Sequence, residues 1–296
     1  MRVKLIALVG PTASGKSAFA VALAKKLNGE VISADSRQVY RGLDIGTGKI
    51  TKREMRGVPH HMIDIASLNK TFTAHDFLIQ GRRAARDITK RTLVPIVSGG
   101  TGFYIDTLVG RISLADVPPN KKMRARLDKK TNQQLLALLR KYAPRRAKNI
   151  DTHNKRRLVR ALEIALSKKA PPSRTTHPPY NVLWIGISPS KEDLRKRIRA
   201  RLMARMKLGM VAEARRLYKN GLSYQRMENL GLEYRWLAHL LQKQITRTEF
   251  DAGLSRDIYR YAKRQLTYWK RNKDIRWFAP NKTNDAVRLA KKFLAL

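Results

Sequence analysis

The feature that most constrains this chain is the stretch GPTASGKS, which runs from Gly10 to Ser17 directly after the apolar run VKLIALV. Its spacing, G-x-x-x-x-G-K-[ST], is that of a phosphate-binding loop between a buried strand and a helix. The glycines permit tight turns, so that successive backbone N–H groups can point at one anion. The N-terminus of the following helix adds to the attraction. The stretch therefore predicts an anion site and leaves open whose phosphates it holds.

Two side chains of this loop have separate expected roles. Lys16 places a positive charge on the phosphates, and the hydroxyl of Ser17 can join the coordination shell of Mg²⁺, the cofactor we expect. The backbone of the whole loop faces the anion in this interpretation. We therefore assign phosphate binding to Gly10, Pro11, Thr12, Ala13, Ser14, Gly15, Lys16 and Ser17.

Apolar strands and amphipathic helices alternate around this loop. Residues 3–9 are predicted to form a central strand, and residues 29–36 a second one. Residues 73–91 carry the 3.6-residue apolar repeat of a helix, and a short buried strand follows at 93–100. Strands and helices at these intervals indicate parallel βαβ units. We therefore predict an α/β fold with a P-loop NTPase-like, doubly wound parallel sheet.

Ligands of such sheets bind at the carboxyl ends of the strands. Gly10, Asp35 and the segment 99–101 all fall at such ends, which predicts one composite site. Asp35 could act as a general base, or it could cap a helix. The stretch SGGTGFY, residues 98–104, could belong to the site or form a simple turn between a strand and a helix.

The charge of the chain points to a polyanionic partner. The 296 residues contain 63 Lys or Arg and 22 Asp or Glu, a net charge of +41. Such a field favours nucleic acid first and an acidic membrane surface second, although a host whose proteins are all basic would also explain part of it. No apolar run of about 18 residues appears, so we expect no membrane span. The absence of cysteine excludes disulfides and thiolate zinc sites, and a cytoplasmic protein is expected.

A basic helical segment interrupts the α/β pattern. Residues 111–160 hold 16 Lys or Arg and 3 Asp or Glu, a net charge of +13. The Pro-rich stretch at 168–180 is predicted to be a linker, after which 181–188 returns to a strand pattern. We therefore predict a helical insertion at 113–176 within a core formed by 1–112 and 177–296.

Two helical stretches of this sequence combine basic and apolar residues. Arg156, Arg157 and Arg160 lie within two helical turns, where they could contact phosphates or form a solvated face. Beyond Ser190, which with Asp193 resembles a capping box, the chain is predicted to be helical to about residue 272. Within 256–272, one face is predicted to be core: Tyr259, Ala262, Leu266 and Trp269. The basic residues of that stretch remain to meet a polyanion.

Together these stretches resemble the tRNA dimethylallyltransferase family, also called tRNA isopentenyltransferases. The resemblance depends on GPTASGKS, DSRQVYRGLDIGTGK, PHHMIDI, GGTGFY, NKRRLVRALE and AKRQLTYW, which occur in the family's order and cover nearly the whole chain. The second and fourth of these blocks are far more specific than the phosphate loop. The stretch NLGLEYR at 229–235 departs from the family's usual G-Y-K/R-E/Q, which leaves its RNA contacts in doubt, and Thr152 stands where many relatives carry proline.

The resemblance implies a reaction. The loop would hold the diphosphate of dimethylallyl diphosphate, and the prenyl group would pass to the exocyclic amine of the adenosine at position 37 of a tRNA. Asp35 matches the family's general base, and Thr101 matches a position near the reacting centre. Lys16, the loop amides and Mg²⁺ would stabilise the leaving diphosphate. Arg215 aligns with a family arginine that contacts the diphosphate.

The resemblance also implies how the anticodon stem-loop of the tRNA binds. The target base must leave its stack to reach the sheet edge, and the basic insertion would hold the stem. A monomer is expected. The residues assigned to tRNA contact are Asp35, Ser36, Arg37, Gln38, Thr101, Arg124, Arg156, Arg157 and Arg160.

Three other functions are alternatives to this one. A small-molecule or nucleotide kinase would use the same loop for ATP but gives no role to a basic insertion. A prenyltransferase acting on free AMP leaves the insertion and the long C-terminal region unexplained. A non-enzymatic RNA-binding protein would not need intact Lys16, Ser17, Asp35 and Thr101.

Overall fold

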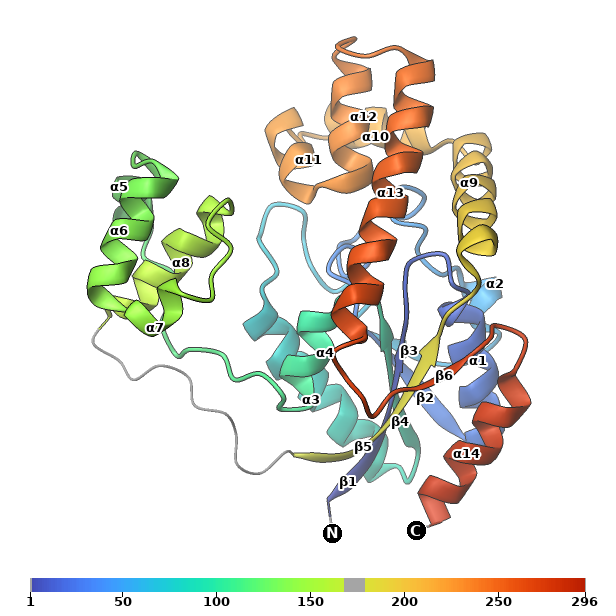
Figure 1. The fold of residues 1–296 in the computed structure, drawn as a ribbon. Coiled ribbons are helices and arrows are strands. Elements are labelled where there is room, and N and C mark those ends of the chain that lie inside the picture. Colours follow the sequence, from blue (N-terminus) through green and yellow to red (C-terminus); the bar gives the residue numbers. More distant parts are fainter. Residues whose placement is uncertain (1, 168–178, 296) are drawn as a thin grey trace. The chain divides into compact units, whose positions relative to one another are not determined.

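The computed structural model describes residues 2–167 and 179–295, and it divides into two compact units (Figure 1). The first unit comprises Met1–Gly110 and His177–Leu296, and the second comprises Arg111–Thr176. The predicted Pro-rich linker lies outside the described residues except for 179 and 180. Each unit encloses its own apolar core.

A single parallel sheet forms the centre of the first unit. Its strand order is β3-β2-β4-β1-β5-β6, and each pair of neighbouring strands is parallel. The register aligns Val9 with both Gly99 and Gly186, so that these strands end at the same edge. The predicted α/β fold with a parallel sheet is confirmed. The strands are β1 Val3–Val9, β2 Gly29–Ser33, β3 His60–His61, β4 Val94–Gly99, β5 Tyr180–Ile187 and β6 Arg276–Phe278.

Helices cover both faces of this sheet (Figure 1). Successive side chains of β1 point to opposite faces, because a strand has a period of two residues. Leu5, Ala7 and Val9 pack in one cluster with residues of α3 and α4, whereas Ile6 and Leu8 pack with residues of α1 and α14. Burial on both faces explains the continuous apolar run in the sequence. The helices are α1 Lys16–Leu27, α3 Ala74–Lys90, α4 Gly102–Leu108 and α14 Thr283–Ala295, and α2 Lys52–Met55 is a single turn.

A group of C-terminal helices forms a second cluster in the same unit. Its core contains Phe250 and Leu254 of the longest helix together with Val39 and Leu43 from the segment after β2. Ser190 caps the first helix by accepting the Asp193 N–H, as predicted. The helices are α9 Lys191–Lys207, α10 Met210–Lys219, α11 Tyr224–Leu230, α12 Leu232–Leu241 and α13 Arg247–Trp269.

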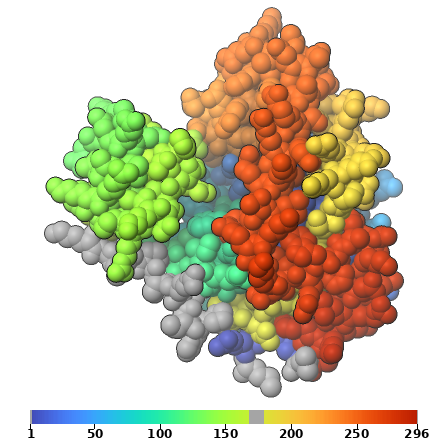
Figure 2. Space-filling view, viewed as in Figure 1, coloured from blue at the N-terminus to red at the C-terminus, as the bar shows by residue number. Residues whose placement is uncertain are grey.

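The two faces of α13 differ as the sequence predicts. Ala262 and Trp269 are buried, and Tyr259 and Leu266 pack against the core, whereas Arg260, Lys263 and Arg264 are exposed. Figure 2 shows side chains of α9 in yellow and of α13 in orange to red at the surface of the first unit.

The second unit is a small bundle of helices. Leu127, Leu135, Leu139, Leu158 and Leu162 form its core. Thr131 caps one helix with a capping box to Gln134, and Asn154 caps another. The helices are α5 Lys121–Asp128, α6 Asn132–Tyr142, α7 Pro144–Ala147 and α8 Lys155–Ala165.

Candidate active site

The phosphate loop connects β1 to α1, as its context in the sequence predicts. Gly10 has a φ of +147°, and a Cβ there would lie 2.3 Å from the carbonyl oxygen of Ile187 in β5. Only glycine therefore fits between the loop and the neighbouring strand. Gly15 precedes α1 with a φ of +92°, a conformation that side chains other than glycine rarely adopt.

Lys16 is the cation of this loop. Its Nζ donates a hydrogen bond of 2.5 Å to the carbonyl oxygen of Pro11. The pKa of Lys16 is lowered from 10.5 to about 7, chiefly by burial and also by the nearby Arg201, while Asp35 acts in the opposite direction. A second cation and a carboxylate therefore lie close enough to Lys16 to influence its charge. Ser17, at the second position of α1, is exposed.

Asp35 lies at the carboxyl end of β2 and is held by its own turn. Its Oδ1 accepts the backbone N–H of Arg37 at 2.8 Å and that of Gln38 at 3.3 Å. The capping alternative considered for Asp35 is thus observed, although it caps an isolated turn and not a helix. These two bonds fix the orientation of the carboxylate at the sheet edge, which is also what a general base requires.

Thr101 joins the ends of β2 and β4. Its Oγ1 accepts the Ser36 N–H at 3.2 Å, and its own N–H donates to the Ala34 carbonyl oxygen at 3.2 Å. The structure therefore brings Asp35 and Thr101 together, as the composite site requires. The stretch 98–104 is both a turn into α4 and a part of this site.

Gln265 is a site residue that the sequence analysis did not assign. It lies on α13, is 6% exposed, and bridges two loops of the site with one carboxamide. Its Oε1 accepts the Thr12 N–H at 2.7 Å, and its Nε2 donates to the Gly100 carbonyl oxygen at 2.9 Å. The signal available in the sequence was a polar residue on the otherwise apolar face that contains Ala262 and Trp269.

Arg201 is the second unassigned residue. It lies on α9, and its Nη2 donates to the carbonyl oxygen of Gly48 at 2.7 Å. Burial and the neighbouring Arg205 lower the pKa of Arg201, while nearby carboxylates including Asp35 raise it. By contrast, Arg215 is exposed on α10. Lys16 therefore has Arg201 beside it, and the diphosphate contact assigned to Arg215 stays a prediction.

Two of the arginines predicted to bind tRNA hold the second unit together. Glu163 is 1% exposed, and its carboxylate pairs with Arg124 at 2.7 Å and with Arg160. It also accepts the backbone N–H of Asn120 at 2.6 Å. Burial raises the pKa of Glu163, but the bonds from Arg124, Asn120 and Arg160 outweigh it and bring the pKa to about 2. The RNA contacts of Arg124 and Arg160 stay predictions, since both guanidinium groups stabilise this bundle.

The other two predicted RNA ligands of this unit differ in exposure from that pair. Arg156 and Arg157 are exposed on α8. Asn154 caps the start of α8 by accepting the N–H of Arg157, so that both arginines lie in the first turn of the helix. The start of α8 therefore carries two solvent-exposed cations.

The described residues contain neither a metal-ion cluster nor a membrane-spanning helix. Across 2–167 and 179–295, no group of three or more His, Asp or Glu side chains is placed to hold a metal ion. No helix within those same ranges combines the length and the apolar character needed to cross a membrane.

Comparison with known proteins gives consistent matches. The sequence model of the IPP transferase family matches residues 38–272. The chain is 44% identical over 272 residues to tRNA dimethylallyltransferase 2 of Treponema denticola, covering 90% of this chain and 91% of that protein. It is 39% identical over 289 residues to tRNA dimethylallyltransferase of Halalkalibacterium halodurans, covering 94% of this chain and 91% of that protein.

A solved structure agrees with these matches in fold. The crystal structure of the full-length tRNA isopentenylpyrophosphate transferase from Bacillus halodurans superposes with a TM-score of 0.73 at 37% identity. The superposition covers 99% of this chain and 95% of that one. A eukaryotic dimethylallyltransferase acting on tRNA has the same fold, with a TM-score of 0.87 at 24% identity over 99% of this chain and 80% of that one.

Proposed function

The chain belongs to the IPP transferase family and is a transferase that prenylates tRNA, and we propose that it uses dimethylallyl diphosphate as the donor. The acceptor is the exocyclic amine of the adenosine at position 37, beside the anticodon. The observation that supports this most directly is how the phosphate loop is joined to the turn of Asp35: Gln265 bonds both Thr12 and Gly100, and Thr101 accepts the Ser36 N–H. The ATP-dependent kinase alternative is not favoured, because the relatives are named transferases of this family.

In the proposed reaction, the bond between the first carbon of the prenyl group and the diphosphate oxygen breaks, and a bond from that carbon to the adenine nitrogen forms. Negative charge develops on the leaving diphosphate. We assign the stabilisation of that charge to Lys16, Arg201 and the N–H groups of the loop. The N–H groups of Thr12 and Ser14 are not among them, because they donate to Gln265 and to the Pro11 carbonyl oxygen. Such stabilisation lowers the barrier more than it strengthens substrate binding. Gln265 holds the Thr12 N–H in place and ties the loop to Gly100.

The adenine amine must lose a proton as it attacks. We assign this proton to the carboxylate of Asp35, whose Oδ1 is fixed by two backbone N–H groups and whose turn is joined to Thr101 through Ser36. Diphosphate and the prenylated tRNA are then the products. The base must be extruded from its stack to reach this carboxylate, and we assign its contacts to Ser36, Arg37 and Gln38.

Magnesium fits the donor set of this site. Mg²⁺ is usually bound through few protein oxygens together with substrate phosphates and water, and the exposed hydroxyl of Ser17 at the start of α1 is such an oxygen. Bound there, Mg²⁺ would neutralise charge on the diphosphate. The protein side of the site would then consist of Ser17 and the loop.

The second unit is proposed to bind the anticodon stem through its exposed cations, Arg156 and Arg157. A monomer acting in the cytoplasm is expected from the same resemblance. Cations that neutralise RNA phosphates make the affinity for tRNA fall as the salt concentration rises. The salt dependence of binding therefore distinguishes arginines that contact phosphates from arginines that only stabilise the fold.

The decisive experiment incubates unmodified tRNA with the protein, Mg²⁺ and dimethylallyl diphosphate, and then measures nucleoside masses. A prenyl mass on adenosine supports the proposal, and Asp35→Asn should abolish it, because a carboxamide cannot take the proton of the attacking amine. No added mass with the wild-type protein, combined with ATP hydrolysis in a parallel tube, would refute it.

A further inference from the structure

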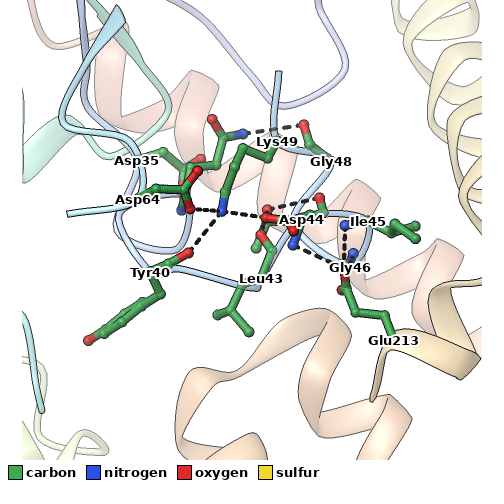
Figure 3. Close-up of polar contacts among 12 residues, drawn as sticks. Asp35, Tyr40, Leu43, Asp44, Ile45, Gly46, Gly48, Lys49, Asp64 and Glu213 are labelled. Carbon is green, nitrogen blue, oxygen red and sulfur yellow. Dashed lines mark hydrogen bonds and ion pairs between the residues drawn. The ribbon is translucent and has the colours of Figure 1, made fainter. Parts of the chain in front are cut away.

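Glu213 is a buried carboxylate that none of the steps above uses. It lies on α10, is 1% exposed, and accepts four hydrogen bonds. Figure 3 shows it beside Asp44, Ile45 and Gly46. Its Oε2 accepts the N–H groups of Asp44 at 3.1 Å and Ile45 at 2.7 Å, and its Oε1 accepts the N–H of Gly46 at 2.9 Å. The hydroxyl of Tyr234 on α12 donates the fourth, to Oε1 at 2.7 Å. One side chain thus satisfies three consecutive N–H groups of residues 43–48, called here the 43–48 loop.

A second contact from α9 and α12 holds the same loop. Arg205 donates from Nη1 to the Gly46 carbonyl oxygen at 2.7 Å and pairs with Glu233 at 3.1 Å. Gly46 also lies directly against Tyr234, because a Cβ on Gly46 would lie 2.6 Å from the Tyr234 hydroxyl oxygen. Glu233 and Tyr234 belong to the stretch 229–235, to which the sequence analysis could assign no role. Tyr234 lies directly against the 43–48 loop, whereas Glu233 acts on it only through Arg205.

The 43–48 loop in turn supports residues of the proposed site. The carbonyl oxygen of Gly48 accepts the side chain of Arg201 at 2.7 Å and that of Gln38 at 3.4 Å. Arg201 is proposed to stabilise the leaving diphosphate, and Gln38 to contact the extruded base. The side chain proposed to act on the prenyl donor and the one proposed to contact the acceptor base therefore donate to the same carbonyl oxygen, that of Gly48. Gly48 belongs to the loop that Glu213 holds.

The loop is also fixed from the side of the sheet. Lys49 Nζ donates to the Tyr40 carbonyl oxygen at 2.9 Å and to Asp44 at 2.6 Å, and it pairs with Asp64 (Figure 3). The Lys49 side chain is 6% exposed. The lysine thus joins the loop to Tyr40 and to Asp64, which follows β3, while Glu213 holds residues 44–46 against the helices.

We propose that Glu213, with Tyr234, is a positioning residue for prenyl transfer: it holds the 43–48 loop so that Gly48 orients Arg201 and Gln38 together. A carboxylate suits this role because it is acceptor-only and can face four donors at once. A carboxamide would turn an NH₂ group toward at least one of those donors. The proposal rests on the proposed function, since it assigns Arg201 and Gln38 to the two substrates.

The test compares two single variants, their double variant and a control by kinetics and by amide hydrogen exchange. Glu213→Gln should remove the exchange protection of the Asp44–Gly46 amides and lower kcat/KM about a hundredfold, since a displacement of 1 Å near a reacting group costs that much. Tyr234→Phe removes one of the four bonds and should cost less, about tenfold or below. If Glu213→Gln does not fold, Tyr234→Phe carries the test.

The matched control is Asp257→Asn. Asp257 accepts the indole N–H of Trp236 at 3.1 Å, so this change also replaces a carboxylate with a carboxamide at a contact between α12 and α13. It should leave kcat/KM within about twofold of the wild-type value, because the contact does not touch the 43–48 loop.

The double variant separates positioning from simple loss of stability. In the Glu213→Gln background, Tyr234→Phe should have little further effect, because the two groups act as a unit. Wild-type kcat/KM in Glu213→Gln, or retained protection of the three amides, overturns the positioning role. A wild-type protein that does not prenylate tRNA overturns the proposed function instead, so the two failures are distinguishable.

Discussion

Replacing Lys16 with methionine is expected to stabilise the ligand-free protein while removing prenyl transfer. In the unfolded chain the lysine keeps its proton up to its ordinary pKa of 10.5, whereas burial lowers the pKa in the folded protein to about 7. Between these two pH values, folding must release a proton or bury a charge. The wild-type protein is therefore less stable than it would be with a neutral side chain, as is common at sites built to bind an anion.

The size of this effect follows from linkage between folding and protonation. A shift from 10.5 to about 7 costs about 4 kcal/mol at pH 7 and about 2 kcal/mol at pH 9. The variant also loses the hydrogen bond to the Pro11 carbonyl, which is worth about 1 kcal/mol. Lys16→Met should thus be more stable by about 3 kcal/mol at pH 7 and by about 1 kcal/mol at pH 9. The advantage of the variant shrinks with pH because the unfolded wild-type chain binds more protons than the folded protein in this range, so that the stability of the wild type rises with pH.

The assay is urea unfolding of both proteins at pH 7 and pH 9, in buffers without phosphate. Lys26→Met, at an exposed position near the end of the same helix, is the control, and its stability relative to wild type should not change between the two pH values. A Lys16→Met protein that is no more stable than wild type at pH 7, or whose advantage does not shrink by pH 9, would refute the reasoning.

Three further outcomes are expected. Arg157→Ala should lower the slope of log K against log salt for tRNA binding by about one, as removal of one phosphate contact does, and an unchanged slope would exclude such a contact. Glu163→Gln should cost about 3 kcal/mol in the stability of the helical bundle, because it removes the buried carboxylate that pairs with Arg124 and Arg160, and denaturation measures it. Since the pKa of Glu163 is about 2, the wild-type bundle should lose this contribution only as the pH falls from 4.5 toward 2, a decline that the variant should lack. Gln265→Glu replaces the NH₂ group that donates to the Gly100 carbonyl with an oxygen, and it adds a negative charge beside Thr12. We expect kcat/KM to fall about tenfold. A wild-type kcat/KM would show that this bridge between the two loops is dispensable.

The fold of the core was predictable because its signals are local. A strand buried on both faces appears as a continuous apolar run, and Gly10 and Gly15 are required by backbone geometry within the loop itself. The strand ends that carry Asp35 and Thr101 meet because parallel strands finish at one edge of the sheet. Residue types and spacing alone were sufficient for these statements.

Which of several arginines and lysines on one helix lie at the site was not predictable from the sequence in this way. The helix α9 carries cations at many positions, and Arg195, Lys196 and Arg199 are exposed whereas Arg201 points at the site and Arg205 is buried. No local signal distinguishes them. The resemblance led instead to Arg215, which the structure places at the surface.

The sequence by itself thus determined the phosphate loop, the parallel sheet, the edge at which the site forms and the family of the chain. Only the tertiary structure decided which side chains complete that site, because each of them meets its partner across a long stretch of chain. Gln265 bonds to Thr12 across 253 residues, Glu213 to Gly46 across 167 and Arg201 to Gly48 across 153. Whether a Gln, Glu or Arg is buried and paired depends on what packs against it, and periodicity along one helix does not carry that information.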